Sequence, residues 1–427
     1  MDPVELMRAS FDAAVAAADP LRIVTPHLPQ RPSGRVVVVG AGKAAASMAL
    51  AVERAWPDVA LEGLVITRYE HGAPTQRIRV VEAGHPVPDD TGEVAARDIM
   101  RIVSQLQRDD LLLVLVSGGG SSLLSLPVPD VSMSALKAMT AALLASGAPI
   151  GEMNVVRKHL SQIQGGRLAA TAAELGARVL ALIISDVTGD APTDIASGPC
   201  APDPSTFKDA LVILRRWNAQ VPGAVEQWLQ RGAAGEVAET PKPNDPLFAA
   251  VENRVIATAH RSLEAAAEVL RAAGINAVVL GDSVTGEARE VAKVYAALVR
   301  EIRAFHQPFR APIALISGGE CTVTLPPAVQ GRGGRCTEYL LSLAVELDGM
   351  SGVYALAGDT DGIDGTEDNA GAWWAPDLID RSVCNSVSAR AGLDRHDSYG
   401  FFEAAGALIV TGPTRTNVND YRVILIK

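Results

Sequence analysis

The stretch that decides the fold is "RVVVVGAGKAAAS", residues 35–47, in which a run of β-branched residues ends at glycines and an alanine-rich segment follows. Valine favours strands and alanine favours helices. The stretch therefore predicts a buried strand, a tight turn at Gly40 and Gly42, and a helix. Gly40, Gly42 and Ala45 fit the pattern G-x-G-x-x-A, whose backbone amides can approach a phosphate at a helix N-terminus.

The same alternation of short aliphatic runs and alanine-rich segments continues along the chain, with "LLLVLV" and "VLALII" in the first half and "PIALI" and "VYALA" in the second. Such alternation indicates βαβ units and largely parallel sheets buried on both faces. With 427 residues, the chain exceeds the roughly 250 to 300 residues at which one core stops growing. We expect an α/β fold of two Rossmann-like three-layer α/β/α domains with a cleft between them.

The predicted domains cover residues 1–238 and 247–427, because the segment 229–246 loses its hydrophobic periodicity and gathers glycine, proline and charge. The net charge of −11 and the lack of a basic block exclude a nucleic-acid partner. No apolar run approaches the roughly 20 residues that span a membrane. Four scattered cysteines without a CxxC pair suit a reducing cytoplasm, where we expect the protein. The sequence leaves the oligomeric state open, a homo-oligomer included.

The opening turn raises two ligand hypotheses that the neighbouring residues weaken. A dinucleotide site needs an acid at the end of the second strand, where "VITRY" has none, although Arg68 could meet a 2′-phosphate. A P-loop needs glycine at Val37 and serine or threonine at Ala44. Lys43 remains, a cation in the first helical turn, where the helix already favours anions. We expect Lys43 to bind an anionic group.

A second glycine turn, "SGGGSS", follows an apolar strand and precedes a helical pattern. Its amides and hydroxyls predict an anion nest, made of Ser117, Gly118, Gly119, Gly120, Ser121 and Ser122. A serine hydrolase is disfavoured, since Leu123 stands where the nucleophile elbow needs glycine. The second half repeats a strand followed by Ser-Gly-Gly, which predicts another phosphate-type turn at Ser317, Gly318, Gly319 and Glu320.

Charged residues cluster after several of these elements. Asn154, Arg157 and Lys158 share a helix face by their i,i+3 and i,i+4 spacing, which suits an organic carboxylate or phosphate. A solvated basic face is the alternative. Asp186 and Asp190 follow a strand of the first half, where carboxylates can hold hydrated Mg²⁺ or accept a hydroxyl proton.

Two further charged groups follow in the second half. Asp359 opens an acidic, glycine-rich loop after a strand, and its oxygen ligands favour a hard divalent cation. Arg335 follows a glycine-rich segment at the start of a helix, where an arginine can close over a transferring phosphoryl group. The two glycine turns, the cations and the acidic strand ends together favour phosphoryl transfer.

Over nearly the whole chain, the order and spacing of "VVGAGKAA", "GHPVPDDTG", "LVSGGGSSLL", "MNVVRKHLSQIQGGRLA", "ISDVTGDAPTDIASGP", "GRGGRCTEYLLSLA" and "AGDTDGIDGTEDNAGA" resemble the class II glycerate 2-kinase family, also known by the tartrate-utilisation and MOFRL names. The resemblance implies ATP-dependent phosphorylation of D-glycerate at its 2-hydroxyl, with Mg²⁺ or a similar ion. Lys43 and Arg335 then look like catalytic cations, and the Ser-Gly-Gly loops look like ligand-binding elements.

The mechanism that we expect assigns one task to each group. Lys43 and Arg335 neutralise the γ-phosphoryl charge, Mg²⁺ lies near Asp190 and Asp359, and Asp186 orients or deprotonates the 2-hydroxyl. The glycerate carboxylate docks on Arg157 or on the amides of residues 117–122. The alternative is an NAD(P)H-dependent hydroxypyruvate reductase, which the missing ribose-binding acid disfavours. The chain departs from its relatives at Cys336, where asparagine is usual.

Overall fold

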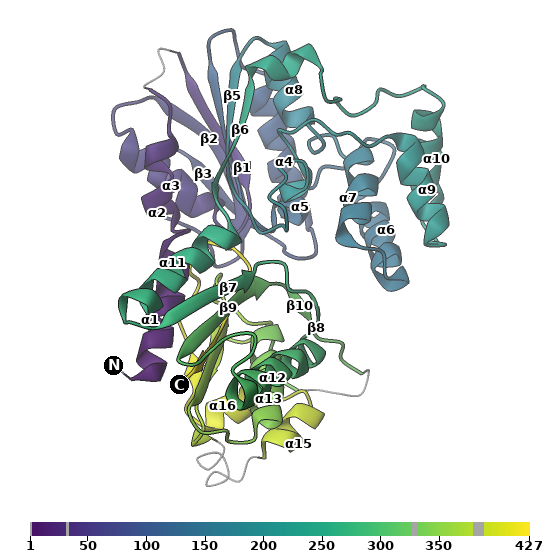
Figure 1. Cartoon of the computed structure of the whole chain (residues 1–427). Coiled ribbons are helices and arrows are strands. Elements are labelled where there is room, and N and C mark those ends of the chain that lie inside the picture. The colour runs from purple at the N-terminus through teal and green to yellow at the C-terminus, as the bar shows by residue number, and fades with distance from the viewer. Residues whose placement is uncertain (1, 31–33, 327–330, 379–387) are drawn as a thin grey trace. The chain divides into compact units, whose positions relative to one another are not determined.

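The computed structural model describes residues 2–30, 34–326, 331–378 and 388–427. Cys384 lies outside these residues. The chain divides into one unit of residues 20–256 and a second unit that combines residues 1–19 with residues 257–427 (Figure 1). Each unit is built on its own six-stranded sheet.

The sheet of the first unit has the strand order of dinucleotide-binding Rossmann folds, β3-β2-β1-β4-β5, with β6 added beside β5. Its strands are β1 (Val36–Ala41), β2 (Leu61–Arg68), β3 (Arg79–Ala83), β4 (Leu111–Val116), β5 (Arg178–Ile184) and β6 (Val251–Ala257). The pairs among β1 to β5 are all parallel. The order reverses between β1 and β4, and ligands of such sheets bind at the carboxyl ends of the strands that flank this point.

Helices cover both faces of this sheet. The side chains of Val37 and Val39 on β1 pack in one core with α4 (Asp90–Val103) and α8 (Arg167–Glu174). Val36 and Val38 point the other way and are also fully buried, and α3 (Ala45–Ala55) contacts β1 and β2. The predicted α/β class and three-layer arrangement are therefore confirmed for this unit.

A helical insertion with its own apolar core extends the first unit (Figure 1). It consists of α6 (Met133–Ser146), α7 (Ile150–His159), α9 (Phe207–Arg216) and α10 (Gly223–Ala233). The remaining short helices of this unit are α2 (Pro20–Ile23), η1 (Thr25–His27), α5 (Gly120–Leu123), η2 (Ile195–Ser197) and η3 (Pro246–Ala250). Among the described residues of the whole chain, no helix is long and apolar enough to cross a membrane.

The sheet of the second unit is mixed, in contrast to the largely parallel sheet that its aliphatic runs predict. Its order is β13-β12-β11-β14-β9-β7, formed by β7 (Asn276–Gly281), β9 (Ile313–Gly319), β11 (Val353–Asp359), β12 (Gly371–Trp374), β13 (Leu408–Ile409) and β14 (Asp420–Ile426). The final strand, β14, runs antiparallel between β9 and β11. The hydrophobicity of a segment indicates that the strand is buried, but it does not indicate whether the strand runs parallel or antiparallel to its neighbours.

Helices again cover both faces of the second sheet. One face packs against α1 (Pro3–Ala16) and α11 (Ala259–Ala272), and the other against α12 (Ala288–Phe305) and α13 (Arg335–Leu347). The smaller elements are β8 (Gly286–Glu287), β10 (Cys321–Thr322), α15 (Ala389–Asp394) and α16 (Ser398–Ala404).

The division of the chain differs from the predicted one at both boundaries. Residues 1–19 belong to the second unit because Leu6, Met7 and Phe11 of α1 pack on α11 and its sheet. The expected linker belongs to the first unit, where Glu239 accepts a hydrogen bond from the Phe207 amide. Its polar composition predicts exposure, but these contacts hold it in place.

Replacing Phe11 tests the assignment of α1 to the second unit. Phe11 is buried and its ring centroid lies 5.7 Å from that of Tyr421 on β14. Phe11→Ala should cost the second unit about 3 to 5 kcal/mol through the cavity it leaves. Hydrogen exchange should accelerate in β11 and β14 but not in β1 and β4. Asp12→Ala, at an exposed site of the same helix, should change little; faster exchange in the first sheet instead would contradict the assignment.

Candidate active site

Two turns interlock where the strand order of the first sheet reverses. Gly42 adopts a φ of 139°, and a Cβ there would lie 2.2 Å from the Ser117 hydroxyl oxygen. The Lys43 amide donates to the Gly118 carbonyl at 2.8 Å, and the Ala44 amide donates to the Ser117 hydroxyl at 2.9 Å. Only glycine at position 42 therefore allows the turn after β1 to lie against the turn after β4.

This interlock changes the role expected of the first turn. The amides of residues 42–45 donate, in chain order, to the Ile66 carbonyl, the Gly118 carbonyl, the Ser117 hydroxyl and the Gly42 carbonyl. Gly40 serves strand packing, because a Cβ there would lie 2.0 Å from the Leu115 carbonyl oxygen. The expected phosphate contact through these amides is thus replaced by protein hydrogen bonds. The half-buried side chain of Lys43 is the group that this turn can offer an anion.

The second turn differs from the first, because two of its backbone amides do not donate to any described protein group. Gly119 adopts a left-handed φ of 80°, and within the described part of the chain the amides of Gly118 and Gly119 have no hydrogen-bond acceptor. A Cβ at Gly119 would lie 2.9 Å from the His85 ring and 3.4 Å from Cγ of Lys43. Two backbone donors therefore lie beside the side chains of a lysine and a histidine, a combination that suits an anion.

His85 is a site residue that the sequence analysis did not single out. It follows β3 in the motif "GHPVPDDTG", which entered only as part of the family resemblance. Its position after a strand of the same parallel sheet was the available signal, because the carboxyl ends of such strands share an edge. Asp186 and Asp190 follow β5 at this edge as well, both half-buried.

The other end of the second turn joins a polar chain that reaches α7. Ser121 and Ser197 share a hydrogen bond of 2.9 Å, and Ser197 donates to Oδ1 of Asn154 at 3.2 Å. Arg157 donates to the same Oδ1 at 2.7 Å. Burial lowers the pKa of Arg157 to about 10, and no carboxylate contributes to that shift. Arg157 is therefore a cation without a counter-charge among the described residues.

Lys158 does not share this site, although its helical spacing predicts a common face with Asn154 and Arg157. It is buried, and its ammonium group lies 3.2 Å from Asp203 and donates to the Thr193 hydroxyl. Burial raises the pKa of Asp203, but Lys158 and Ser205 outweigh that effect and lower it overall. This ion pair accounts for Lys158 without a ligand.

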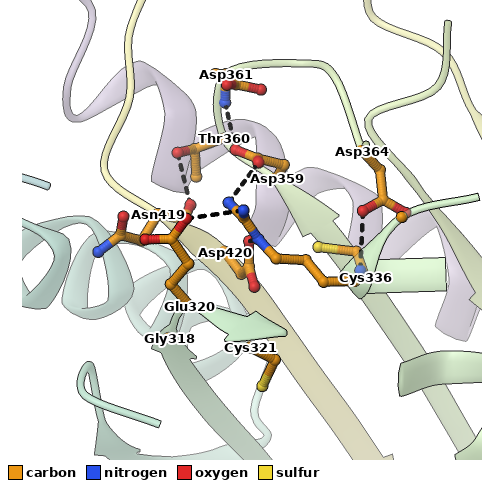
Figure 2. A network of polar contacts seen from close by, with 12 residues as sticks. Gly318, Glu320, Cys321, Cys336, Asp359, Thr360, Asp361, Asp364, Asn419 and Asp420 are labelled. Carbon is orange, nitrogen blue, oxygen red and sulfur yellow. Dashed lines mark hydrogen bonds and ion pairs between the residues drawn. The ribbon is translucent and has the colours of Figure 1, made fainter. Parts of the chain in front are cut away.

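The second unit holds a separate charged network, whose acids Glu320, Asp359 and Asp420 are shown in Figure 2. Arg335 pairs with all three. The guanidinium donates to Asp420 at 2.7 Å, to Asp359 at 2.8 Å and to Glu320 at 2.8 Å. Burial alone lowers the pKa of Arg335, but the three carboxylates raise it well above its ordinary value. Asp420 also pairs with the buried Arg422 at 2.6 Å. Arg335 is thus compensated, unlike Arg157.

The contacts around Arg335 limit the ability of Asp359 to act as the predicted metal ligand. Asp359 is already engaged with Arg335, and in the described ranges no three His, Cys, Asp or Glu side chains form a group that could hold a metal ion. The expected turn at residues 317–320 also differs, because Ser317, Gly318 and Gly319 belong to β9 and pair with β14. Only Glu320 extends beyond the strand, toward Arg335.

Asp364 and Asp420 complete the network. Asp364 belongs to the acidic loop that predicts a cation site, whereas Asp420 has no such motif. Asp364 accepts hydrogen bonds from the amides of Cys336 and Thr337 at the start of α13, which fixes the helix that carries Arg335. Burial raises the pKa of Asp364 to about 6, against the effect of these amides. Cys336 is completely buried, so its thiol packs in the core.

Comparisons with known proteins agree with this architecture. Residues 6–230 match the family described as "Domain of unknown function (DUF4147)", and residues 313–420 match the MOFRL family. A Thermotoga maritima protein named D-glycerate 2-kinase is 38% identical over 100% of this chain and 99% of its own. The chain belongs to the class II glycerate kinase family.

Other members of the class II glycerate kinase family carry different names. An Agrobacterium vitis protein whose name describes a hydroxypyruvate reductase is 51% identical, over 99% of this chain and 94% of its own. The crystal structure of a Thermotoga maritima glycerate kinase superposes with a TM-score of 0.86, at 37% identity and with both chains fully covered.

Replacing Lys158 separates its structural role from ligand binding. Lys158→Met leaves the buried Asp203 carboxylate without its cation and should cost the helical insertion about 3 to 5 kcal/mol, read from hydrogen exchange in α7 and α9. Lys208→Met, at an exposed position of α9, is the control and should stay within about 0.5 kcal/mol. Unchanged exchange in Lys158→Met would show that the ion pair contributes no stability.

Proposed function

We propose that this protein is a glycerate 2-kinase that transfers the γ-phosphoryl group of ATP to the 2-hydroxyl of D-glycerate. The observation that carries the proposal is the pair of amides of Gly118 and Gly119, which have no acceptor among the described residues and lie beside the Lys43 side chain. It stands at the strand reversal of a chain 38% identical to a protein named D-glycerate 2-kinase. A cytoplasmic location and a homo-oligomer stay predictions.

In this proposal Lys43 and the two amides neutralise charge that develops on the phosphoryl oxygens. Preorganised donors of this kind act without reorganising during the reaction, which is the main source of their catalytic effect. Arg335 is the second cation. A phosphate that binds Arg335 would replace one of the carboxylates that are now its partners.

Carboxylate oxygens suit Mg²⁺, and Mg²⁺ commonly binds through one or two carboxylates together with substrate phosphates and water. A site of that kind needs no preformed group of three protein ligands. Asp359 and Asp190 are the proposed carboxylates, and the ion would supply charge neutralisation at the phosphates. Asp186, which follows β5, is the proposed group that orients or deprotonates the 2-hydroxyl.

A hydroxypyruvate reductase is the competing function, and the name of the Agrobacterium vitis relative favours it. Two observations count against it. The strand β2 ends at Arg68, a cation where dinucleotide-binding folds place the acid that binds a ribose hydroxyl. The amides of Lys43 and Ala44, which a dinucleotide pyrophosphate would use, donate to the second turn instead.

The reaction itself separates the two functions. Purified protein with ATP, Mg²⁺ and D-glycerate should release ADP, and phosphorus NMR should identify 2-phosphoglycerate as the product. Hydroxypyruvate with NADH or NADPH should give no loss of absorbance at the nicotinamide band. Formation of the 3-phosphate, or nicotinamide oxidation without ADP release, would contradict the proposal.

Lys43→Ala tests the proposed phosphoryl site. Loss of this cation should lower kcat about 100- to 1,000-fold, the scale seen when one preorganised stabilising donor is removed. The variant should still fold, because the turn is held by backbone hydrogen bonds that alanine retains. Lys208→Ala is the matched control at an exposed position of the same unit. A variant with wild-type kcat would remove Lys43 from the mechanism.

A further inference from the structure

We propose that Asn154 and Ser197 are positioning residues that hold Arg157 as an uncompensated cation, and that this group binds the carboxylate of the substrate. The inference rests on the proposed function for the identity of the substrate, D-glycerate. It selects one of the two docking places that the sequence leaves open and adds Ser197, which the sequence analysis did not single out.

The hydrogen bonds define which way each group donates. Ser197 uses its only proton toward Oδ1 of Asn154, so Ser121 is the donor in the 2.9 Å bond between the two hydroxyls. Arg157 donates to the same Oδ1, which fills both lone pairs of that oxygen. The amide orientation of Asn154 is thereby fixed, and its Nδ2 points away from these partners.

The donors left over form a site for an acceptor. Asn154 is 5% exposed, and among the described residues its Nδ2 has no acceptor. Arg157 donates one hydrogen bond, through NH1 to Asn154, and its other N–H groups have no partner among the described residues either. Arg157 is only half-buried, so these donors can reach a ligand from solvent. A carboxylate supplies two acceptor oxygens and the missing negative charge.

Because the side chain of Asn154 is a neutral amide, it holds Arg157 in place without neutralising its charge, and the charge can interact with a ligand. A carboxylate at position 154 would satisfy the same two donors and would also neutralise Arg157, as the acids around Arg335 do. Ser121 adds a second element of recognition. Having donated its proton to Ser197, its hydroxyl can only accept, which suits the hydroxyl of a hydroxy acid.

Ser197 reaches this position through an unusual backbone. Ala196 and Ser197 adopt φ values of 52° and 57°, in the left-handed region that residues other than glycine rarely occupy. A Cβ at Gly120 would lie 2.5 Å from the Ala196 Cβ, so this turn packs directly against the second glycine turn. Residues held in such conformations concentrate at functional sites.

Asn154→Asp is the decisive variant, because it is nearly isosteric, places a negative charge beside Arg157 and replaces the Nδ2 donor by an acceptor. The KM for D-glycerate should rise about 10- to 100-fold, as expected when a charged hydrogen-bond partner is lost to a ligand. The KM for ATP should stay within about twofold and the melting temperature should be equal or higher, since the variant gains an ion pair. A purely structural role for Asn154 would leave the KM for D-glycerate unchanged.

Ser197→Gly provides an independent readout. It relieves the left-handed backbone but removes the hydroxyl, so stability should rise or stay equal while the KM for D-glycerate rises about 3- to 10-fold. Ala196→Gly is the matched control, because it relieves the same kind of backbone and should leave that KM unchanged. Equal KM values in both variants would overturn the role of Ser197.

Calorimetric titration of malonate, a dicarboxylate without a hydroxyl, into protein without ATP tests the anion site apart from activity. Wild-type protein should bind it, and the Asn154→Asp variant should bind it at least about tenfold more weakly. Malonate binding without phosphorylation of D-glycerate would refute the proposed function and retain the site. Phosphorylation of D-glycerate with the same KM in wild-type protein and in Asn154→Asp would support the proposed function and refute the carboxylate site. Equal malonate binding by both proteins, or binding by neither, would overturn the inference.

Discussion

The contact between Gly42 and Ser117 is the constraint on which the rest of the first unit's site depends. A side chain at Gly42 would overlap the serine hydroxyl, so the turn after β1 can lie against the turn after β4 only with glycine there. The contact lets the second turn accept hydrogen bonds from the first, through the Gly118 carbonyl and the Ser117 hydroxyl. The amides of Gly118 and Gly119 in the second turn therefore have no acceptor among the described residues and can bind a ligand. The side chain of Lys43 lies beside Gly119.

The cations that the sequence groups together differ in electrostatic state. Arg335 has three carboxylates around it and Lys158 has Asp203, whereas Arg157 has only a neutral amide. A cation already paired in the protein gains little from an anionic ligand unless its acid finds another partner. A cation without an acidic partner in the protein gains its electrostatic interaction with the ligand without losing an existing ion pair. The arrangement therefore suits tight recognition of a small anion in the first unit and an exchange of partners around Arg335 in the second.

The local features of this chain were predictable from its sequence. The aliphatic runs place the strands of the first sheet, and the glycines place both turns, because burial and left-handed backbone leave direct marks on residue type. The motifs that contain Lys43, Ser121, Asn154 and Arg157 were noticed in the same way, and the ligand-binding roles of these residues stay predictions. Each stands in a short motif next to a strand or on one face of a helix.

Features that depend on distant residues were not predictable. Lys158 was misplaced because Asp203 lies far along the chain, and Arg335 pairs with Asp420, which follows it by 85 residues. The antiparallel strand β14 and the packing of α1 on the second sheet likewise depend on contacts that no local pattern contains. Ser197 carries no motif of its own, since its role follows from a backbone conformation that the sequence does not reveal.

The central claim is that the interlocked turns direct Lys43 and the amides of Gly118 and Gly119 to one phosphate. A crystal structure of the protein with D-glycerate and a non-hydrolysable ATP analogue tests it most directly. The account predicts the terminal phosphate within hydrogen-bond distance of the Lys43 ammonium and of both amides, with the glycerate carboxylate on Arg157. A terminal phosphate bound elsewhere, with Lys43 in contact with neither ligand, would contradict it.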